Sequence, residues 1–261
     1  MNAIRSALLG ALCISSPALA TPFQQVAYNP ANEMDVELVL AVDISQSMDT
    51  EEQEIQRAGY VAALTSQDFL HAVQAGPLGR IAVSYLEWGG VDEHFIVADW
   101  TVIQDASSAA SFAEKVRNAP LRQVQRTSIA SALEKSVELI KGNEFQGLRE
   151  VIDISGDGPN NQGGSVTEMR DRLLKSGVTI NGLPLMMKSN KNTWQAMLNL
   201  DHYYEDCVIG GPGSFAIPVR SKGAFADAIR MKLVMEIAGL APSPEIIPVS
   251  LREPVRCGLF D

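Results

Sequence analysis

A strand-like apolar run that ends in three closely spaced oxygen donors constrains this sequence more than any other feature. Residues 36–42 predict a buried strand because apolar side chains dominate the run. Asp43, Ser45 and Ser47 follow at alternate positions and offer one carboxylate and two hydroxyls. Hard divalent cations prefer such oxygen ligands, so the spacing predicts a cation site at the end of this strand.

Two further oxygen donors stand downstream, in places that suit the same site. Thr127 opens a predicted helix, and Asp157 follows a predicted strand at residues 149–155. In an open α/β sheet the strand ends and their loops form the ligand crevice, where these residues can meet. Asp153 is the other acid of this region, but it should lie within the strand. Each residue alone could equally well cap a helix or a turn.

These residues together resemble the metal-ion-dependent adhesion site of von Willebrand factor type A domains. The resemblance implies that Ser45 and Ser47 contact the metal directly, and Thr127 directly or through water. It implies that Asp43 and Asp157 act largely through water. Within that family, the chain is similar to small exported bacterial members of unknown function.

The chain departs from the family pattern at two places, and neither removes a ligand oxygen. Gln125 and Arg126 stand where two glycines commonly precede the threonine, and Ser155-Gly156 replaces an apolar residue followed by threonine. The resemblance implies a module without catalytic activity that holds Mg²⁺, or Mn²⁺ or Ca²⁺. An acidic residue of a protein partner would complete the coordination of the metal.

A metal-dependent hydrolase is the alternative interpretation, most sharply a phosphatase of the haloacid dehalogenase type. Those enzymes also carry an acid after the first strand and a Gly-Asp motif late in the chain. Asp43 and Asp157 match that outline. Ser45 disfavours it, because those phosphatases need a second acid there and a hydroxyl transfers protons poorly near neutral pH.

The N-terminal segment predicts export. Arg5 precedes a short apolar run at residues 7–14, and Ala18-Leu19-Ala20 forms a cleavage site of the A-x-A type. The run is too short for a stable membrane span, so we expect a periplasmic or secreted protein without stable membrane insertion. The predicted divisions are a signal peptide at 1–20, a linker at 21–33, a type A domain at 34–240 and a tail at 241–261.

Net charge limits the kinds of partner that this protein is expected to bind, and the cysteine content bears on the cellular compartment in which it works. A net charge of −10 over 261 residues should repel nucleic acids, so a nucleic-acid partner is not expected. Cys207 and Cys257 remain after signal cleavage, and an even pair in an oxidising compartment points to a disulfide. Such a bond would close a loop of about 50 residues and stabilise by roughly 4 kcal/mol. The alternative is two unpaired thiols.

Strands and helices are predicted to alternate, which favours a doubly wound, mostly parallel sheet with helices on both faces. Gly89-Gly90 suggests a hairpin and therefore one antiparallel edge strand. The acidic and aromatic segment 201–206 is expected to be a solvated loop. The predicted strands are 36–43, 80–86, 94–100, 149–155, 178–185 and either 207–209 or 216–219. The predicted helices are 50–66, 107–118, 128–141, 165–176, 192–199 and 222–239.

Overall fold

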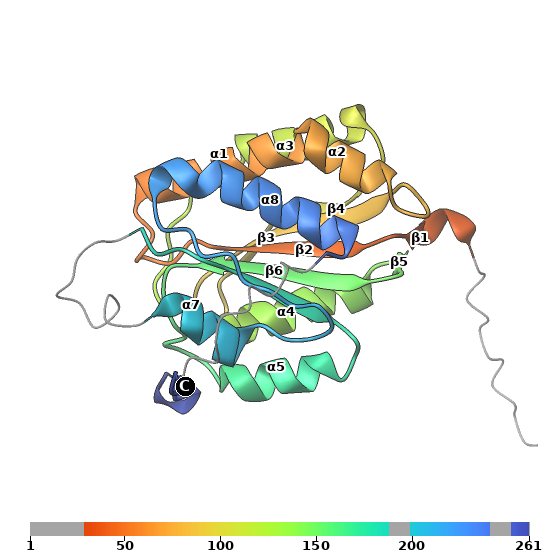
Figure 1. Ribbon diagram of the computed structural model, residues 1–261. Helices are drawn as coiled ribbons and strands as arrows, with labels where there is room; N and C mark the ends of the chain where they lie inside the picture. Colours follow the sequence, from red (N-terminus) through yellow and green to blue (C-terminus); the bar gives the residue numbers. More distant parts are fainter. Residues whose placement is uncertain (1–28, 188–198, 241–251, 261) are drawn as a thin grey trace, which may run out of the picture. The chain divides into compact units, whose positions relative to one another are not determined.

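A five-stranded sheet with the order β4-β3-β2-β6-β7 forms the centre of the fold (Figure 1). All neighbouring strands are parallel except β3 and β4, which pair antiparallel at one edge. The predicted α/β class and its antiparallel edge strand are therefore confirmed. The strands are β2 (Glu37–Asp43), β3 (Ile81–Trp88), β4 (His94–Ile103), β6 (Glu150–Gly156) and β7 (Thr179–Pro184).

The computed structural model describes residues 29–187, 199–240 and 252–260. The predicted signal peptide lies outside these residues, and so does the predicted helix at 192–199 apart from its last residue. A second, two-stranded parallel sheet joins β1 (Glu33–Met34) to β5 (Gln146–Gly147). Within the described part of the chain, no helix is both long and apolar enough to cross a bilayer.

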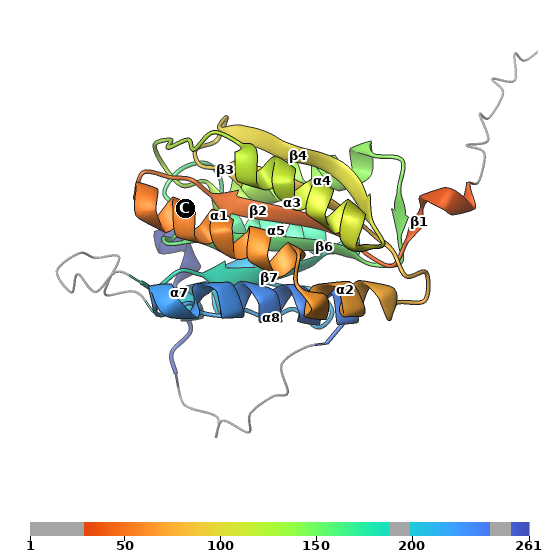
Figure 2. The ribbon, with the colours of Figure 1, turned by 90° about the horizontal axis from the view of Figure 1, so that it is seen from above.

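Helices cover both faces of the central sheet (Figures 1 and 2). One face carries α1 (Thr50–Leu64), α2 (Gln67–Gln74), α3 (Ala106–Asn118) and α8 (Phe225–Ala238). The other face carries α4 (Ile129–Gly142), α5 (Val166–Leu174) and the short α7 (Leu200–Tyr203). Two hydrophobic cores result, one on each side of the sheet.

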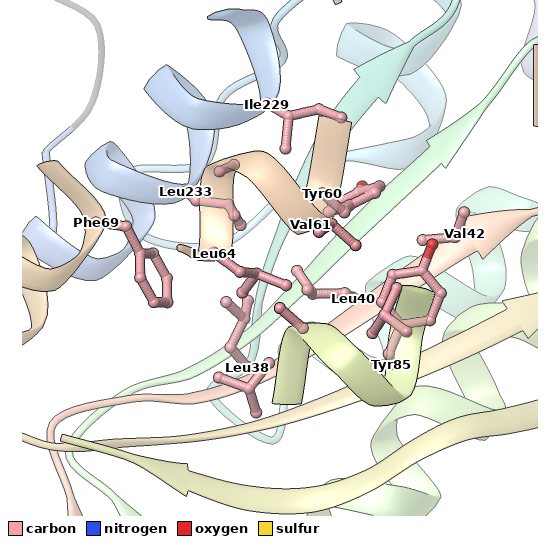
Figure 3. Packing of buried hydrophobic residues seen from close by; sticks show 14 of the residues in the cluster. Leu38, Leu40, Val42, Tyr60, Val61, Leu64, Phe69, Tyr85, Ile229 and Leu233 are labelled. Atoms are coloured by element: carbon pink, nitrogen blue, oxygen red, sulfur yellow. The ribbon is translucent and has the colours of Figure 1, made fainter. Parts of the chain in front are cut away.

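The central strand β2 is apolar almost throughout because it contributes to both cores. Leu38, Leu40 and Val42 point toward α1 and α8. Figure 3 shows these three side chains in one cluster with Leu64 of α1. Val39 and Ala41 point to the opposite core. Such two-sided burial requires the near-continuous apolar run by which the strand was predicted.

The hairpin predicted at Gly89-Gly90 is confirmed. The amide of Gly89 donates to the carbonyl of Glu93 at 3.0 Å, and the amide of Glu93 donates to the carbonyl of Gly90 at 3.2 Å. This turn connects the ends of β3 and β4 and places β4 at the edge of the sheet.

The helix predicted at 50–66 is shorter than expected, and a separate helix follows it. α1 begins after Asp49, whose carboxylate accepts from the amide of Glu52 at 2.8 Å in a capping box. The helix ends at Leu64, and Ser66 caps α2 by accepting from the amide of Phe69 at 3.2 Å. Ser66 therefore begins a second helix rather than ending the first, which is why the sequence pattern missed α2.

The sixth strand predicted at 207–209 or 216–219 is wrong. Cys207 and Val208 belong to a π-helical turn, η2 (Tyr204–Val208). Ala216 forms an isolated parallel bridge to Gly182 of β7, and Val219 forms another to Leu185, just beyond that strand. The amides of Ile217 and Val219 donate to the carbonyls of Gly182 and Pro184, but Pro184 has no amide hydrogen to donate in return, which interrupts the ladder.

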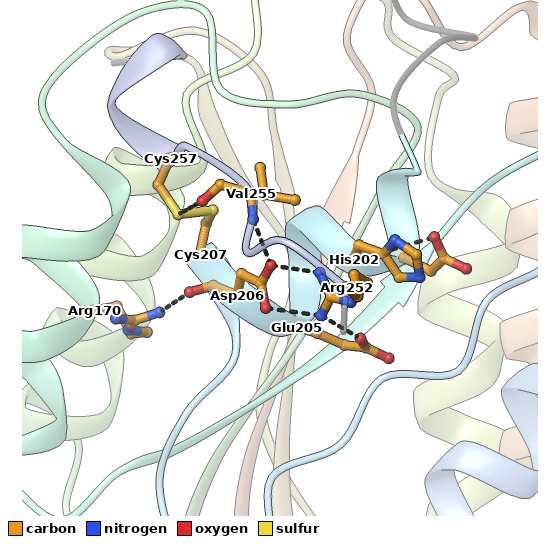
Figure 4. A network of polar contacts seen from close by, with 9 residues as sticks. Arg170, His202, Glu205, Asp206, Cys207, Arg252, Val255 and Cys257 are labelled. Carbon is orange, nitrogen blue, oxygen red and sulfur yellow. Dashed lines mark hydrogen bonds and ion pairs between the residues drawn. A yellow bond between two sulfur atoms is a disulfide. The ribbon is translucent and has the colours of Figure 1, made fainter. Parts of the chain in front are cut away.

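Cys207 and Cys257 form a disulfide with a Cα–Cα distance of 5.6 Å (Figure 4). Arg252 supports the same connection through two contacts to the Asp206 carboxylate, at 2.7 and 2.9 Å. The amide of Val255 donates to that carboxylate at 2.8 Å. Residues 252–260 are therefore held against η2 by a covalent bond and by charge-assisted hydrogen bonds.

Candidate metal centre

The candidate site lies at the carboxyl ends of the two central strands. Asp43 is the last residue of β2, and Asp157 follows the last residue of β6. The parallel register pairs Val42 with Ser155, so the two strands end at the same level. Thr127 lies just before Ser128, the residue that caps α4. This is the sheet edge at which the sequence predicted the five residues to meet.

A chain of hydrogen bonds connects the two acids through the two serines. The Asp43 Oδ1 atom accepts from the amide of Ser45 at 2.7 Å. The hydroxyls of Ser45 and Ser47 lie 2.9 Å apart, and the Ser47 hydroxyl donates to Asp157 Oδ1 at 2.5 Å. Four of the five predicted residues are therefore directly linked.

Backbone contacts hold the Thr127 loop beside this chain. The amide of Val124 donates to the carbonyl of Ile44 at 3.1 Å, and the amide of Ser128 donates to the carbonyl of Gly89 at 2.7 Å. Asn161 makes a reciprocal pair with Thr127: the Thr127 amide donates to Asn161 Oδ1, and the Asn161 amide donates to the Thr127 carbonyl, each at 2.9 Å.

The three predicted hydroxyls open into one polar pocket of about 470 Å³. Arg126, which stands where the family pattern commonly has glycine, was given no role in the predicted site. Asn161 was not predicted to belong to it. The only sequence signal for Asn161 is its place in the polar turn after Asp157. The residues that line the pocket are Ser45, Gln46, Ser47, Gln125, Arg126, Thr127 and Asn161.

Asp43 is fully buried beneath the pocket, and its environment favours a cation. Its Oδ2 atom has no hydrogen-bond partner among the described residues. Burial, and next the nearby charge of Asp157, raises the pKa of Asp43 to about 7. A Cβ atom on Gly156 would lie only 2.9 Å from Asp43 Oδ2, so a side chain there would press on this carboxylate.

The donor set fits a hard divalent cation. It combines two carboxylates with three hydroxyls, and oxygen donors of these kinds suit Mg²⁺, Mn²⁺ and Ca²⁺. Within the described ranges, no three His, Cys, Asp or Glu residues gather at a common point. A cation held here would therefore depend on the serine and threonine hydroxyls.

Solved structures identify the class of fold to which this domain belongs. It is similar to a pilus adhesin, SpaC, from Lactobacillus rhamnosus GG, with a TM-score of 0.55 and 12% identity over 78% of this chain and 30% of that one. It is also similar to the von Willebrand factor domain of the pilus tip protein Mfa5 from Porphyromonas gingivalis. That match has a TM-score of 0.53 and 10% identity over 81% of this chain and 98% of that one.

A third similar structure is the mussel byssus protein PTMP1, described with a zinc-occupied MIDAS motif. Its TM-score is 0.52 at 14% identity, over 78% of this chain and 46% of that one. The chain thus spans less than half the length of the adhesin and of the byssus protein. At these identities the likeness shows the fold, which is that of a von Willebrand factor type A domain.

The sequence itself places the chain in a family. The family model described as "Protein of unknown function (DUF1194)" matches residues 33–241. The chain belongs to this family. Comparison with curated proteins gave no match.

Proposed function

We propose that this protein is an exported metal-binding type A module that binds a protein partner through a partner carboxylate. The observation that carries the proposal is the chain of hydrogen bonds that links Asp43 and Asp157 through the two serines, beside a pocket that Ser45, Ser47 and Thr127 line. Ser45, Ser47 and Thr127 would hold Mg²⁺, or Mn²⁺ or Ca²⁺, together with Asp43 and Asp157. The bound cation would supply Lewis acidity toward the carboxylate of the partner.

The chemistry of the donors supports this mode of binding. The proposed direct ligands are neutral hydroxyls, and Asp43 and Asp157 would act largely through water, so the cation would keep its Lewis acidity. An incoming carboxylate therefore remains attracted to it. The pocket is polar at its mouth and is lined mainly by uncharged hydroxyl and amide groups. Two structures with a similar fold, a pilus adhesin and a byssus protein with a zinc-occupied MIDAS motif, agree with adhesion through a metal.

Ser45 supports a binding role over phosphoryl chemistry. Its hydroxyl is buried and hydrogen-bonded to Ser47, at the position where a phosphatase of the alternative class needs an acid. Export is supported by the predicted signal peptide and by the disulfide between Cys207 and Cys257, since such bonds persist in oxidising compartments. The proposed location is the periplasm or the cell exterior.

Calorimetric titration of Mg²⁺ and Mn²⁺ into the mature protein tests the proposal. We expect one site in the parent protein, and loss of that site in Asp43→Ala and in Ser45→Ala. Ser165→Ala is the matched control, because Ser165 caps α5 and does not line the pocket. The proposal fails if the parent binds neither metal, or if Ser45→Ala binds as tightly as the parent.

A further inference from the structure

Arg126 has a backbone conformation that few residues adopt. Its φ is 71°, and among the described residues it is the only non-glycine residue with a positive φ. For an L-residue with a long side chain this left-handed region is unfavourable, and glycine occupies it without steric cost. Strained positions of this kind cluster at functional sites, so the conformation of Arg126 suggests that its side chain has a function.

The Arg126 side chain lies at the pocket and is not engaged elsewhere. It lines the same pocket as Ser45, Ser47 and Thr127, and it is exposed to solvent. Within the described ranges, no hydrogen bond or ion pair engages its guanidinium group. Nearby Arg122 differs, because it contacts Glu87 at 3.4 Å and lies over the Phe95 ring.

The chemistry of the guanidinium group defines what it can bind. Its planar array of N–H donors matches a carboxylate and can hold it through two parallel hydrogen bonds. The remainder of the pocket mouth offers neutral amides from Gln46, Gln125 and Asn161. Among the residues that the structure describes, Arg126 is therefore the one cationic side chain that lines this pocket.

We infer that the pocket binds an acidic peptide segment with two neighbouring carboxylates, and that Arg126 determines this specificity. The inference rests on the proposed function, because the cation takes the first carboxylate. Arg126 then takes the second, beside the metal rather than on it. A partner with a single exposed acid would use only half of this arrangement.

Two short peptides test the inference in the presence of saturating Mg²⁺. The probes are acetyl-Gly-Asp-Asp-Gly-amide and acetyl-Gly-Asp-Asn-Gly-amide, which differ by one carboxylate. We expect the parent protein to bind the two-acid peptide about tenfold more tightly, as one charge-assisted contact allows. Arg126→Gln should abolish this preference. Arg126→Lys, which keeps the charge but not the fork of donors, should retain part of it.

Arg126→Gly separates specificity from folding. Glycine adopts the observed φ without strain, so the thermal midpoint of this variant should not fall below that of the parent. Its preference for the two-acid peptide should nevertheless be lost. Equal affinity of the parent protein for both peptides, or an undiminished preference in Arg126→Gln, overturns the inference.

Titration of Mg²⁺ without peptide distinguishes this inference from the proposed function. If the parent does not bind Mg²⁺, the proposed function fails and the inference fails with it. If the parent binds Mg²⁺ and a single carboxylate but shows no preference for the second, only the role of Arg126 fails.

Discussion

Repulsion between two neighbouring acids at the candidate metal centre should lower the folding stability of the metal-free protein. Asp43 is buried, and the charge of Asp157 contributes to the raised pKa of Asp43. Without a cation this repulsion acts against folding, whereas a bound divalent ion would remove it. The same residues that suit the site for a metal thus weaken the metal-free protein.

Asp157→Asn should therefore stabilise the metal-free protein while abolishing its response to metal. At pH 8 in EDTA we expect the free energy of unfolding to rise by about 1 kcal/mol, because one of two like charges is removed. Added Mg²⁺ should raise the thermal midpoint of the parent but not that of the variant. Asp105→Asn, at the cap of α3, serves as the control. A midpoint below that of the parent in EDTA would contradict the prediction.

A second buried group of charges lies between α8 and the sheet. Lys232 is fully buried, lies 2.5 Å from Asp153 Oδ1 and forms an ion pair with Glu236. Asn181 donates to Glu236 Oε1 at 3.0 Å. Two carboxylates thus share one ammonium group. Burial, and next the charge of Asp153, raises the pKa of Glu236 to about 7.

This raised pKa predicts how stability depends on pH. In the unfolded chain Glu236 ionises near its ordinary value of 4.5, whereas in the folded protein it holds its proton up to about pH 7. Its contribution to stability is therefore complete below pH 4.5 and is lost as the pH rises to about 7. Over that window the loss should be on the order of 2–3 kcal/mol.

Glu236→Gln isolates this contribution because glutamine does not ionise. Urea unfolding at pH 4.5 and pH 7.5 should show a smaller fall in stability for the variant than for the parent protein. Glu114→Gln is a matched control on the exposed side of α3 and should follow the parent. Parallel pH profiles for Glu236→Gln and the parent would refute the assignment.

At the scale of elements, β6 connects the metal centre to α8. Its carboxyl end leads into Asp157, and Asp153 within it contacts Lys232 of α8. Just before the strand, Arg149 donates to the carbonyls of Glu236 and Ile237 at 2.7 and 2.6 Å, at the end of α8. α8 is therefore held at two levels, by Asp153 of β6 and by the residue just before this strand, and the strand leads into a candidate ligand.

The central strand should dominate the stability of the domain. Leu40 of β2 is fully buried in the core on the α1 side of the sheet (Figure 3), so Leu40→Ala should lower the free energy of unfolding by about 3 kcal/mol. Ile96→Ala on the edge strand β4 is the control, since Ile96 is 47% exposed. That variant should lose less than about 1 kcal/mol in urea denaturation. Similar losses in both variants would contradict a core centred on β2.

The sequence predicted those elements whose burial produces a clear pattern. Apolar runs identified the five strands of the central sheet, and the Gly89-Gly90 turn identified the antiparallel edge. The α1–α2 break was missed because Ser66 suits a helix end as well as a helix start. Around residue 207 the apolar side chains are buried in a turn, so burial alone did not distinguish turn from strand.

In the candidate site and its surroundings, too, the sequence pattern did not reveal features that depend on the folded backbone. The predicted hydroxyls and acids converge, but Arg126 was noted only as a departure because its positive φ is a property of the folded backbone. The segment 201–206 was expected to be a solvated loop. Instead the segment belongs to α7 and η2, and Tyr203 and Tyr204 are fully buried while its other four residues reach the surface.

At the scale of the whole molecule, the disulfide joins Cys257 near the C-terminus to η2, which follows the short helix α7. Cys207→Ser with Cys257→Ser should lower the free energy of unfolding by roughly 3–4 kcal/mol, because the bond closes a loop of 50 residues. Chemical denaturation of the parent protein with and without reductant checks the value. Cys13→Ser is the control in the full-length precursor. An unchanged midpoint on reduction would show that the bond contributes little.

The path of this bond also decides how the molecule would bear mechanical load. A pull on the C-terminus reaches Cys257 and passes through the disulfide to Cys207, 50 positions earlier in the sequence, so the backbone between the two cysteines is bypassed. That bypassed stretch contains α8. If the disulfide were reduced, this stretch could extend to roughly 175 Å, at about 3.5 Å per residue. If the module were tethered by its C-terminus while it held a partner at the pocket, the force would enter the fold at η2 and α7. The backbone of α8 would not carry that force.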